Sequence, residues 1–178
     1  VLVPGTRILE RDIALAHGTS RTPVHEAVQR LADEGLIEIV PRVGTFVARI
    51  PIDQLEEAML VRTALEAAVV ERVARRTGPE QLARLRTILD EQRDCAAAGD
   101  TQRFHRADEA FHEALAEQAG FPGVWKTIVQ AKSQVDRYRR LTLPMPGRMD
   151  GVVVEHTAVE DALASGHAAE AVKAMREH

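Results

Sequence analysis

The stretch that decides the fold of the first part of the chain is residues 17–35, which read HGTSRTPVHEAVQRLADEG. Gly18 suits the positive φ that ends a helix, and Ser20 is a good N-cap for the helix that follows. Pro23 is tolerated in the first turn of that helix, where a backbone N–H has no intrahelical partner. The stretch therefore predicts a tight turn followed by a helix over about residues 21–34.

The segments on either side of this stretch complete a known motif. Before it, apolar residues at helical spacing predict a short helix over about residues 9–16. After it, two β-rich runs at residues 36–40 and 45–48 flank a turn at residues 41–44 and predict a hairpin. Together these elements make a winged helix-turn-helix over residues 1–50. A complete motif has another helix upstream, so we expect this domain to be truncated at its start, with its first helix missing.

The remainder of the chain, residues 51–178, shows no convincing strand pattern. Gly and Pro residues divide it into segments with helical periodicity. The expected helices span about residues 53–77, 80–98, 101–118, 123–142, 151–164 and 167–178. Six helices joined by short loops predict an antiparallel bundle. The fold class is therefore mainly α, with a winged helix-turn-helix followed by a six-helix bundle.

The composition excludes several classes of protein. Of the 178 residues, 45% are hydrophobic, which is enough for a packed core, and only 3% are aromatic, which favours close-packed helices. The sequence contains no run of about 18 apolar residues that could cross a membrane. We also find no signal peptide, in which a positively charged segment precedes an apolar one. We therefore expect a cytoplasmic protein without a membrane partner. The single cysteine, Cys95, excludes a disulfide scaffold.

The net charge of −4 does not by itself exclude a nucleic-acid partner. Residues 1–50 contain six Arg, no Lys and six acidic residues, so the acidic excess lies wholly in the remainder of the chain. The amino-terminal part, residues 1–50, is called the head from here on. Its zero net charge is compatible with DNA binding if its Arg side chains gather on one face.

The first turn of the second helix carries the residues that a helix-turn-helix directs toward base edges in the major groove. Arg21 can donate two hydrogen bonds to a guanine, while Ser20 and Thr22 can reach phosphates or bases. Arg11, on the preceding helix, is placed to contact backbone phosphates. Alternatively, these are ordinary solvated residues at a helix start. The complete order of turn, helix, capped helix and wing is more specific than that alternative.

Four residues of the predicted bundle have the spacing of a metal site. Asp108 and His112 lie four residues apart, on one face of a helix. His156 and His178 are equidistant from residue 167, at the turn between the last two helices, so an antiparallel hairpin brings them side by side. One carboxylate and three imidazoles suit Zn²⁺, Ni²⁺ or Mn²⁺, with zinc favoured.

Simpler interpretations exist, because a lone His on a helix is more often a surface or hydrogen-bonded residue than a ligand. His105, one turn before Asp108, is the nearest rival to the four. A metal-dependent hydrolase built on the bundle is the alternative function, and it would need a carboxylate placed as general base. Glu109 and Glu113 lie on other helical faces than the ligand pair. No His-Glu-x-x-His motif, Gly-rich phosphate loop or nucleophile elbow occurs.

The head resembles a known DNA-binding domain. Residues 4–8, 20–28 and 31–37 read PGTRI, SRTPVHEAV and LADEGLI, and they are similar to the DNA-binding domain of GntR-family bacterial transcriptional regulators. The helical remainder resembles the FCD effector domain of the FadR-like subfamily. The resemblance covers nearly the whole chain and implies a ligand-responsive, DNA-binding transcriptional regulator.

The resemblance also implies roles for particular residues. In that family the positions matching Arg11, Arg21, His25 and the wing residue Gly44 contact DNA. The family usually has Arg where this chain has His25, and an unperturbed imidazole is mostly neutral at about pH 7.5, which weakens contact with phosphate or guanine. FCD domains commonly carry one Asp and three His at the positions of the four predicted metal ligands.

An effector site is implied in the same way. The ion of FCD domains often helps to hold a small carboxylate. Arg62 matches the Arg of the Arg-x-x-Leu-Glu pattern in the family's first helix, so it is placed to clamp the far end of an organic acid. An ion pair between Arg62 and Glu66 is an equally simple alternative.

Two further expectations concern assembly and partners. Operator sites that such domains bind are usually two-fold related, so we expect a homodimer on operator DNA. A third class of function also stays open, namely a protein-interaction bundle whose head no longer binds DNA. His25 and the neutral charge of the head suggest that alternative.

Overall fold

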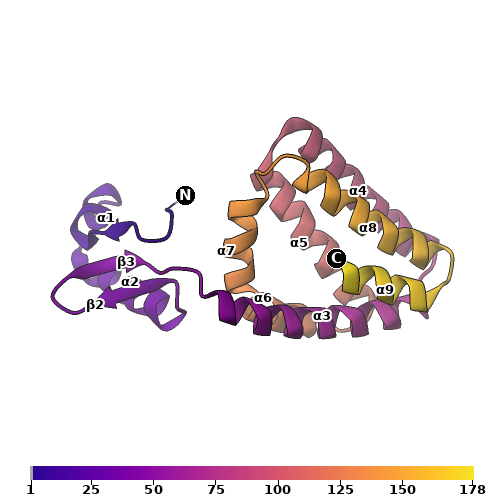
Figure 1. Ribbon diagram of the computed structural model, residues 1–178, viewed down its shortest axis with the longest axis horizontal. Helices are drawn as coiled ribbons and strands as arrows, with labels where there is room; N and C mark the ends of the chain where they lie inside the picture. Colours follow the sequence, from indigo (N-terminus) through magenta and orange to yellow (C-terminus); the bar gives the residue numbers. More distant parts are fainter. Residues whose placement is uncertain (1) are drawn as a thin grey trace. The chain divides into compact units, whose positions relative to one another are not determined.

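The computed structural model describes residues 2–178 and divides into two compact units, one that ends at Pro51 and one that begins at Ile52 (Figure 1). This division falls one residue beyond the boundary expected from the sequence. The first unit contains, in chain order, β1 (Arg7–Ile8), α1 (Glu10–Ala16), α2 (Arg21–Asp33), β2 (Ile37–Val40) and β3 (Gly44–Val47).

A three-stranded antiparallel sheet with the order β1-β3-β2 accompanies the two helices of the first unit. The small core of this unit consists of Ile8, Ala14, Val24, Val28 and Ile37. The helices α1 and α2 pack against each other, and the turn between them contains a glycine, residue 18, at a φ of +62°. The helix-turn-helix and its hairpin are therefore present.

The two-residue strand β1 is not indicated by the sequence. Its residues pair with β3, with Arg7 opposite Phe46 and Ile8 opposite Thr45. Its hydrogen-bonding partners thus come from a segment much later in the chain. A strand this short has no periodicity of its own, so only the folded sheet defines it.

The second unit contains seven helices among the described residues. In chain order they are α3 (Ile52–Ala74), α4 (Pro79–Ala98), α5 (Thr101–Gln118), α6 (Pro122–Ala131), α7 (Ser133–Thr142), α8 (Arg148–Ala164) and α9 (Ala168–Glu177). The helix α4 packs along α5 and α8, and α9 packs along α3 and α8 (Figure 1). Six of the helices share one core, to which they contribute Val70, Leu85, Phe111, Ile128, Val159 and Met175. Among the described residues, no helix is long and apolar enough to cross a membrane.

The helix expected over residues 123–142 is divided at Lys132 into α6 and α7, which corrects the expected six helices to seven. No Gly or Pro marks this break. The ammonium of Lys132 is buried, 3.0 Å from Glu109 of α5 and 2.7 Å from Asp136 of α7. The sequence around Lys132 contains no residue that breaks a helix. Tertiary contacts therefore explain the break better than local helix propensity does.

The helix α8 begins at Arg148, three residues before the start expected at Gly151. The glycine that ends the preceding loop is Gly147, at a φ of +76°. The helices α8 and α9 form the expected hairpin (Figure 1), with Gly166 in its turn at a φ of +72°. This hairpin determines which residues of the last two helices meet.

Candidate functional site

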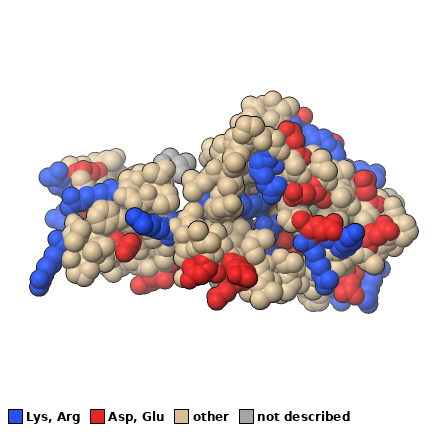
Figure 2. All heavy atoms as spheres, viewed as in Figure 1, with Lys and Arg blue, Asp and Glu red and all other residues tan. Residues whose placement is uncertain are grey.

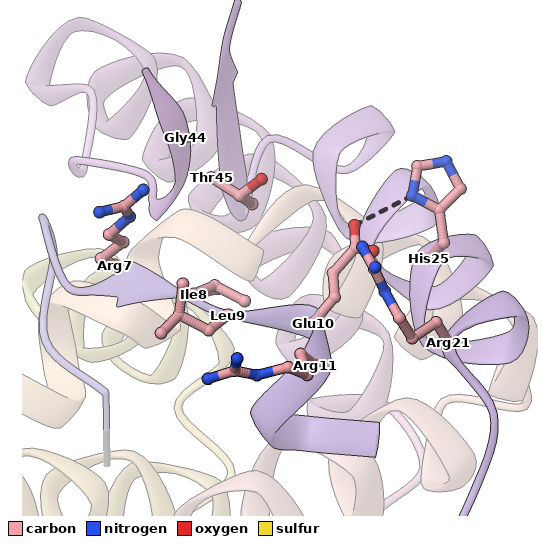
Figure 3. A pocket seen from close by; sticks show the side chains of 9 residues that line it. All are labelled: Arg7, Ile8, Leu9, Glu10, Arg11, Arg21, His25, Gly44 and Thr45. Atoms are coloured by element: carbon pink, nitrogen blue, oxygen red, sulfur yellow. Dashed lines mark hydrogen bonds and ion pairs between the residues drawn. The ribbon is translucent and has the colours of Figure 1, made fainter. Parts of the chain in front are cut away.

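The first candidate site is a hollow of about 600 Å³ on the amino-terminal unit, formed by the starts of α1 and α2 and by the wing (Figure 3). Four of the six predicted DNA-contact residues line it, namely Arg11, Arg21, His25 and Gly44. The other two predicted residues, Ser20 and Thr22, are exposed at the start of α2 and are not part of this lining. Figure 2 shows several Arg side chains at one end of the unit, although residues 1–50 are neutral overall.

Arg7 also lines the hollow, beside the wing. Its Nη2 donates to the backbone oxygen of Val43 at 3.4 Å. Gly44 has a φ of +149°, and a Cβ at this position would lie 3.2 Å from Nε of Arg7. Any larger residue at position 44 would be strained and would press against Arg7. The glycine is therefore explained by the shape of the wing.

A contact between His25 and Glu10 joins the two helices at the hollow. Nδ1 of His25 lies 2.9 Å from Oε1 of Glu10 (Figure 3). The sequence does not indicate Glu10 as a site residue, because only the crossing of α1 and α2 determines which of their residues meet.

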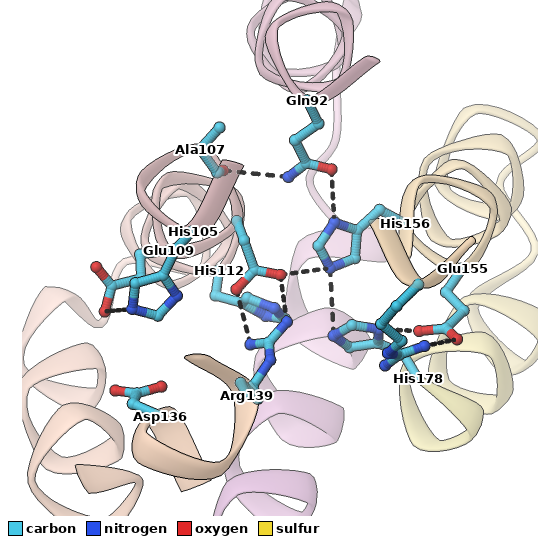
Figure 4. Close-up of polar contacts among 12 residues, drawn as sticks. Gln92, His105, Ala107, Glu109, His112, Asp136, Arg139, Glu155, His156 and His178 are labelled. Carbon is cyan, nitrogen blue, oxygen red and sulfur yellow. Dashed lines mark hydrogen bonds and ion pairs between the residues drawn. The ribbon is translucent and has the colours of Figure 1, made fainter. Parts of the chain in front are cut away.

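The second candidate site lies within the helical unit, where the four predicted metal ligands come together. Figure 4 shows the three histidines of this site. Asp108 and His112 belong to α5, His156 belongs to α8, and His178 directly follows α9. Each residue offers one ligand atom, and these four atoms lie within 4.8 Å of one another. The Nε2 atoms of His156 and His178 are 3.2 Å apart. All four side chains are buried.

Neighbouring oxygen atoms orient two of the imidazoles. Nδ1 of His156 lies 2.9 Å from Oε1 of Gln92, and the amide of Gln92 is fixed in turn because its Nε2 donates to the backbone oxygen of Ala107 at 3.1 Å. Nδ1 of His178 lies 2.7 Å from Oε2 of Glu155. These oxygens only accept hydrogen bonds, so each Nδ1 carries the hydrogen and each Nε2 carries a lone pair.

The ring of His112 is oriented in the same way, with Nδ1 toward an acceptor oxygen and Nε2 toward the centre of the site. Its Nδ1 faces Oε1 of Glu66 at 3.1 Å, without the alignment of a full hydrogen bond, and its Nε2 lies 3.0 Å from Nη2 of Arg62. Three Nε2 atoms therefore converge beside the carboxylate of Asp108. Outer partners that hold metal-binding imidazoles in one orientation are typical of metal sites. The residues present thus fit a divalent metal ion.

Two buried carboxylates at this site, the predicted ligand Asp108 and the outer partner Glu66, stay ionised. Burial raises the pKa of Asp108, but Arg139 and His112 outweigh it and hold that pKa well below its usual range. Burial likewise raises the pKa of Glu66, but His112 and Arg62 lower it to about 2. At neutral pH both groups therefore carry a negative charge.

Two of the imidazoles are neutral at the same pH. Burial, followed by the neighbouring His178, lowers the pKa of His156 well below its usual range. Burial also lowers the pKa of His178, against the opposing effect of Glu155. Ionised carboxylate and neutral imidazole are the protonation states that bind metal ions.

Two buried arginines adjoin the cluster. Arg139 of α7 donates to both oxygens of Asp108, at 2.7 Å and 2.5 Å. The sequence offers four residues of this segment as further effector-binding candidates, without showing which of them faces inward: Arg137, Tyr138, Arg139 and Arg140. The folded chain shows that Arg139 is the one that meets Asp108.

Arg62 makes the ion pair with Glu66 that the sequence left open as an alternative, with Nε 3.0 Å from Oε1. Its Nη2 also lies 3.0 Å from the Nε2 atoms of His112 and His178. Arg62 is only 4% exposed. The guanidinium predicted to clamp an effector thus lies at the cluster, where it already has partners.

His105, the rival ligand, belongs to a second group in which its ligand atom and those of Glu109 and Asp136 lie within 4.8 Å of one another. The ammonium of Lys132 already bridges the two carboxylates, at 3.0 Å and 2.7 Å. This group therefore contains its own cation.

Two further histidines, His17 and His167, are exposed and lie outside both groups.

Comparison with known proteins identifies both units. Residues 57–178 match the FCD domain, and residues 1–47 match the family described as bacterial regulatory proteins, gntR family. An HTH-type transcriptional regulator in an unstable DNA locus of Streptomyces ambofaciens is 35% identical over 99% of this chain and 74% of its own length. The HTH-type transcriptional repressor RspR of Escherichia coli (strain K12) is 30% identical over 100% of this chain and 78% of its own length. In fold the chain is similar to E. coli McbR/YncC, with a TM-score of 0.76 at 23% identity over 99% of this chain and 84% of that one.

These relatives are named as transcriptional regulators and not as enzymes, so the hydrolase alternative finds no support. The order of a winged helix-turn-helix and a helical unit along the chain agrees with the two family matches. The chain is a DNA-binding transcriptional regulator and belongs to the gntR family of bacterial regulatory proteins, with an FCD domain as its effector domain.

Proposed function

We propose that the FCD domain binds one divalent metal ion and that a small carboxylate metabolite bound at this ion changes the affinity of the head for operator DNA. The metal ligands are Asp108, His112, His156 and His178. The observation that carries the proposal is the convergence of three imidazole Nε2 atoms beside one carboxylate, with an oxygen facing each Nδ1. Zinc, nickel and manganese all accept imidazole and carboxylate ligands, so the site suits each of them. Zinc is the favoured ion, because His and Asp are among its usual protein ligands.

When it is bound, the ion supplies positive charge that attracts carboxylate oxygens. The chain itself supplies two guanidinium groups, with Arg62 beside the histidines and Arg139 on the aspartate. A guanidinium binds a carboxylate through two parallel hydrogen bonds. We assign the far end of the metabolite to Arg62, which exchanges its present contacts for the new ones.

On the head, the exposed start of α2 and the hollow beside it support a DNA interface. We propose that Arg21 donates hydrogen bonds to a base edge and that Arg11 contacts backbone phosphates. The interface is completed by Ser20, Thr22, His25 and Gly44. Two copies of the chain bind two related half-sites as a homodimer, in the bacterial cytoplasm where the chromosome lies.

Mass analysis of the purified protein, combined with anomalous scattering from its crystals, tests the metal and the metabolite together. The proposal predicts one zinc, nickel or manganese ion per chain, located by anomalous scattering at the four ligands, and a small organic acid released on denaturation. A protein that carries no metal and binds none on dialysis against zinc would contradict the proposal. If metal is present but no carboxylate of a broad panel changes operator affinity, the effector part is wrong.

A further inference from the structure

A polar cavity of about 220 Å³ lies in the helical unit, where α3 ends, α4 begins and α5 ends. Five residues line it, namely Val73, Arg76, Thr77, Gln81 and Gln118. None of them belongs to the proposed metal or effector site, and Val73 lies about 16 Å along α3 from Arg62. Pockets for drug-sized ligands begin at about 300 Å³, so this cavity has room for a smaller metabolite.

The side chain of Gln118 brings an unpaired acceptor to the polar cavity. Its Nε2 donates to the backbone oxygen of Gln81 at 3.3 Å, whereas its Oε1 is buried and has no hydrogen-bonding partner among the described residues. The reversed amide would point Oε1 at that backbone oxygen, so that two acceptors would face each other. The orientation of the amide is therefore fixed. A buried acceptor without a donor costs free energy, so the cavity favours a ligand that brings an O–H or N–H group.

Arg76 is the one charged residue of the lining. Its guanidinium extends toward the end of α5, because a Cβ added at Gly120 would lie 3.9 Å from its Nη1. The neighbouring Arg72 is already engaged, since its Nε donates to the backbone oxygen of Ala119 at 2.8 Å. The guanidinium of Arg76 has no such acceptor among the described residues. It can therefore bind a carboxylate through two parallel hydrogen bonds.

Two further polar side chains of the lining are held in place by the backbone. The hydroxyl of Thr77 donates to the backbone oxygen of Val73 at 2.7 Å, so its own oxygen can still accept. Oε1 of Gln81 accepts from the backbone N–H of Gly78 at 3.2 Å, so its Nε2 can still donate. The lining thus offers both donors and acceptors, with a positive charge and no negative one.

We infer that the polar cavity binds a small hydroxycarboxylate, whose carboxylate accepts from Arg76 and whose hydroxyl donates to Oε1 of Gln118. A hydroxyl suits the cavity better than an ammonium, because the positive charge of Arg76 repels a second cation. A carboxylate without a hydroxyl leaves Gln118 unpaired. The inference goes beyond the proposed function, since it requires neither the metal ion nor the effector.

Calorimetric titration of lactate into the complete, chelator-treated protein tests the inference. Lactate is expected to bind saturably without zinc. Propionate lacks only the hydroxyl of lactate, and propylene glycol has a hydroxymethyl group in place of its carboxylate. Each is expected to bind about tenfold more weakly than lactate or worse, because one of the two polar side chains loses its partner.

Two variants connect lactate binding to the cavity. Arg76→Gln removes the charge and is expected to weaken lactate binding by about tenfold or more. Gln118→Met removes the acceptor at similar length and is expected to abolish the preference for lactate over propionate, which a general loss of packing would not do. Arg75→Gln is the matched control, because Arg75 pairs on the surface with Glu71 and lies outside the lining, so it should retain the affinity of the wild type. The thermal midpoint checks that each variant is folded.

Four outcomes would overturn the inference. Absence of saturable lactate binding would mean that water alone fills the cavity, and equal affinities for lactate and propionate would remove the role of Gln118. Unchanged lactate affinity in Arg76→Gln would assign the ligand to another site. Binding that requires zinc would assign lactate to the proposed effector site, which would leave the proposed function intact while removing the ligand from the cavity.

Discussion

Arg21 lies exposed in the first turn of α2 and lines the hollow on the head. If it donates to a base edge, Arg21→Ala is expected to weaken operator binding by about 1–3 kcal/mol. The loss should be confined to the preferred sequence, because only the base contact discriminates. Binding measurements with duplexes that vary at each half-site position check this, and specificity should relax at one position per half-site.

Arg11 provides the contrast, since it is proposed to contact phosphates. Arg11→Ala is expected to weaken binding to all sequences about equally and to lower the slope of log affinity against log salt by about 1. Titrations at several salt concentrations measure both quantities. If Arg21→Ala and Arg11→Ala both retain the affinity of the wild type, the proposed contacts of the helix-turn-helix are wrong.

At the residue scale, helix geometry explains which site residues could be predicted. Asp108 and His112 share a face by their spacing alone, and hairpin symmetry pairs His156 with His178, so their meeting in the structure follows from local rules. Arg139 reaches the same cluster from α7. Its direction depends on how α7 is placed in the folded unit, and no local pattern contains that information.

At the scale of the elements, the buried ammonium of Lys132 lies at the junction of α6 and α7, and we expect its ion pairs to stabilise that junction. Lys132→Met keeps the length of the side chain but leaves Glu109 and Asp136 without their cation. Breaking a fully buried ion pair costs roughly 3–5 kcal/mol, and the partial exposure of the Glu109 carboxylate should reduce this to about 2–3 kcal/mol in the free energy of unfolding. Urea denaturation measures the change.

Lys173→Met is the matched control, because Lys173 pairs with Glu177 on the surface with 75% of its side chain exposed. Its loss is expected to change the free energy of unfolding by less than about 0.5 kcal/mol. Equal effects of the two substitutions would show that Lys132 does not hold the junction.

The same junction shows where element prediction from sequence fails. Most helix ends coincide with Gly or Pro, such as Gly99 at a φ of +67° after α4, and these ends were predictable. The break between α6 and α7 and the strand β1 have no such signal. Both have contacts with partners distant in the sequence, namely Glu109 for Lys132 at the break and strand β3 for β1.

At the scale of the whole molecule, the buried imidazoles couple stability to pH. The pKa values of His156 and His178 are lowered in the folded chain, mainly by burial. Between these values and the ordinary pKa of about 6.5, the unfolded chain binds more protons than the folded one, so stability falls as pH falls. We expect the thermal midpoint of chelator-treated protein to decrease from about pH 7 to about pH 5.

The lowered pKa values of Asp108 and Glu66, the latter about 2, extend the loss of stability to lower pH. These carboxylates stabilise the fold above their ordinary pKa of about 4, and the contribution is lost as pH falls toward their folded values.

For the two imidazoles, the contradicting result is a thermal midpoint that is constant between about pH 7 and about pH 5. It would show that His156 and His178 are not buried in the neutral form.

Calorimetric titration of zinc into chelator-stripped protein tests the central claim, that one ion joins α5, α8 and the end of α9. Loss of an outer partner of a metal ligand typically weakens binding about 10–100-fold, so loss of the direct ligand in His156→Ala is expected to weaken it at least about 100-fold. The thermal midpoint of the zinc-loaded protein should fall with the affinity. His105→Ala, which removes a buried imidazole outside the four ligands, should retain the affinity of the wild type. Full zinc affinity in His156→Ala, or its loss in His105→Ala, would contradict the account.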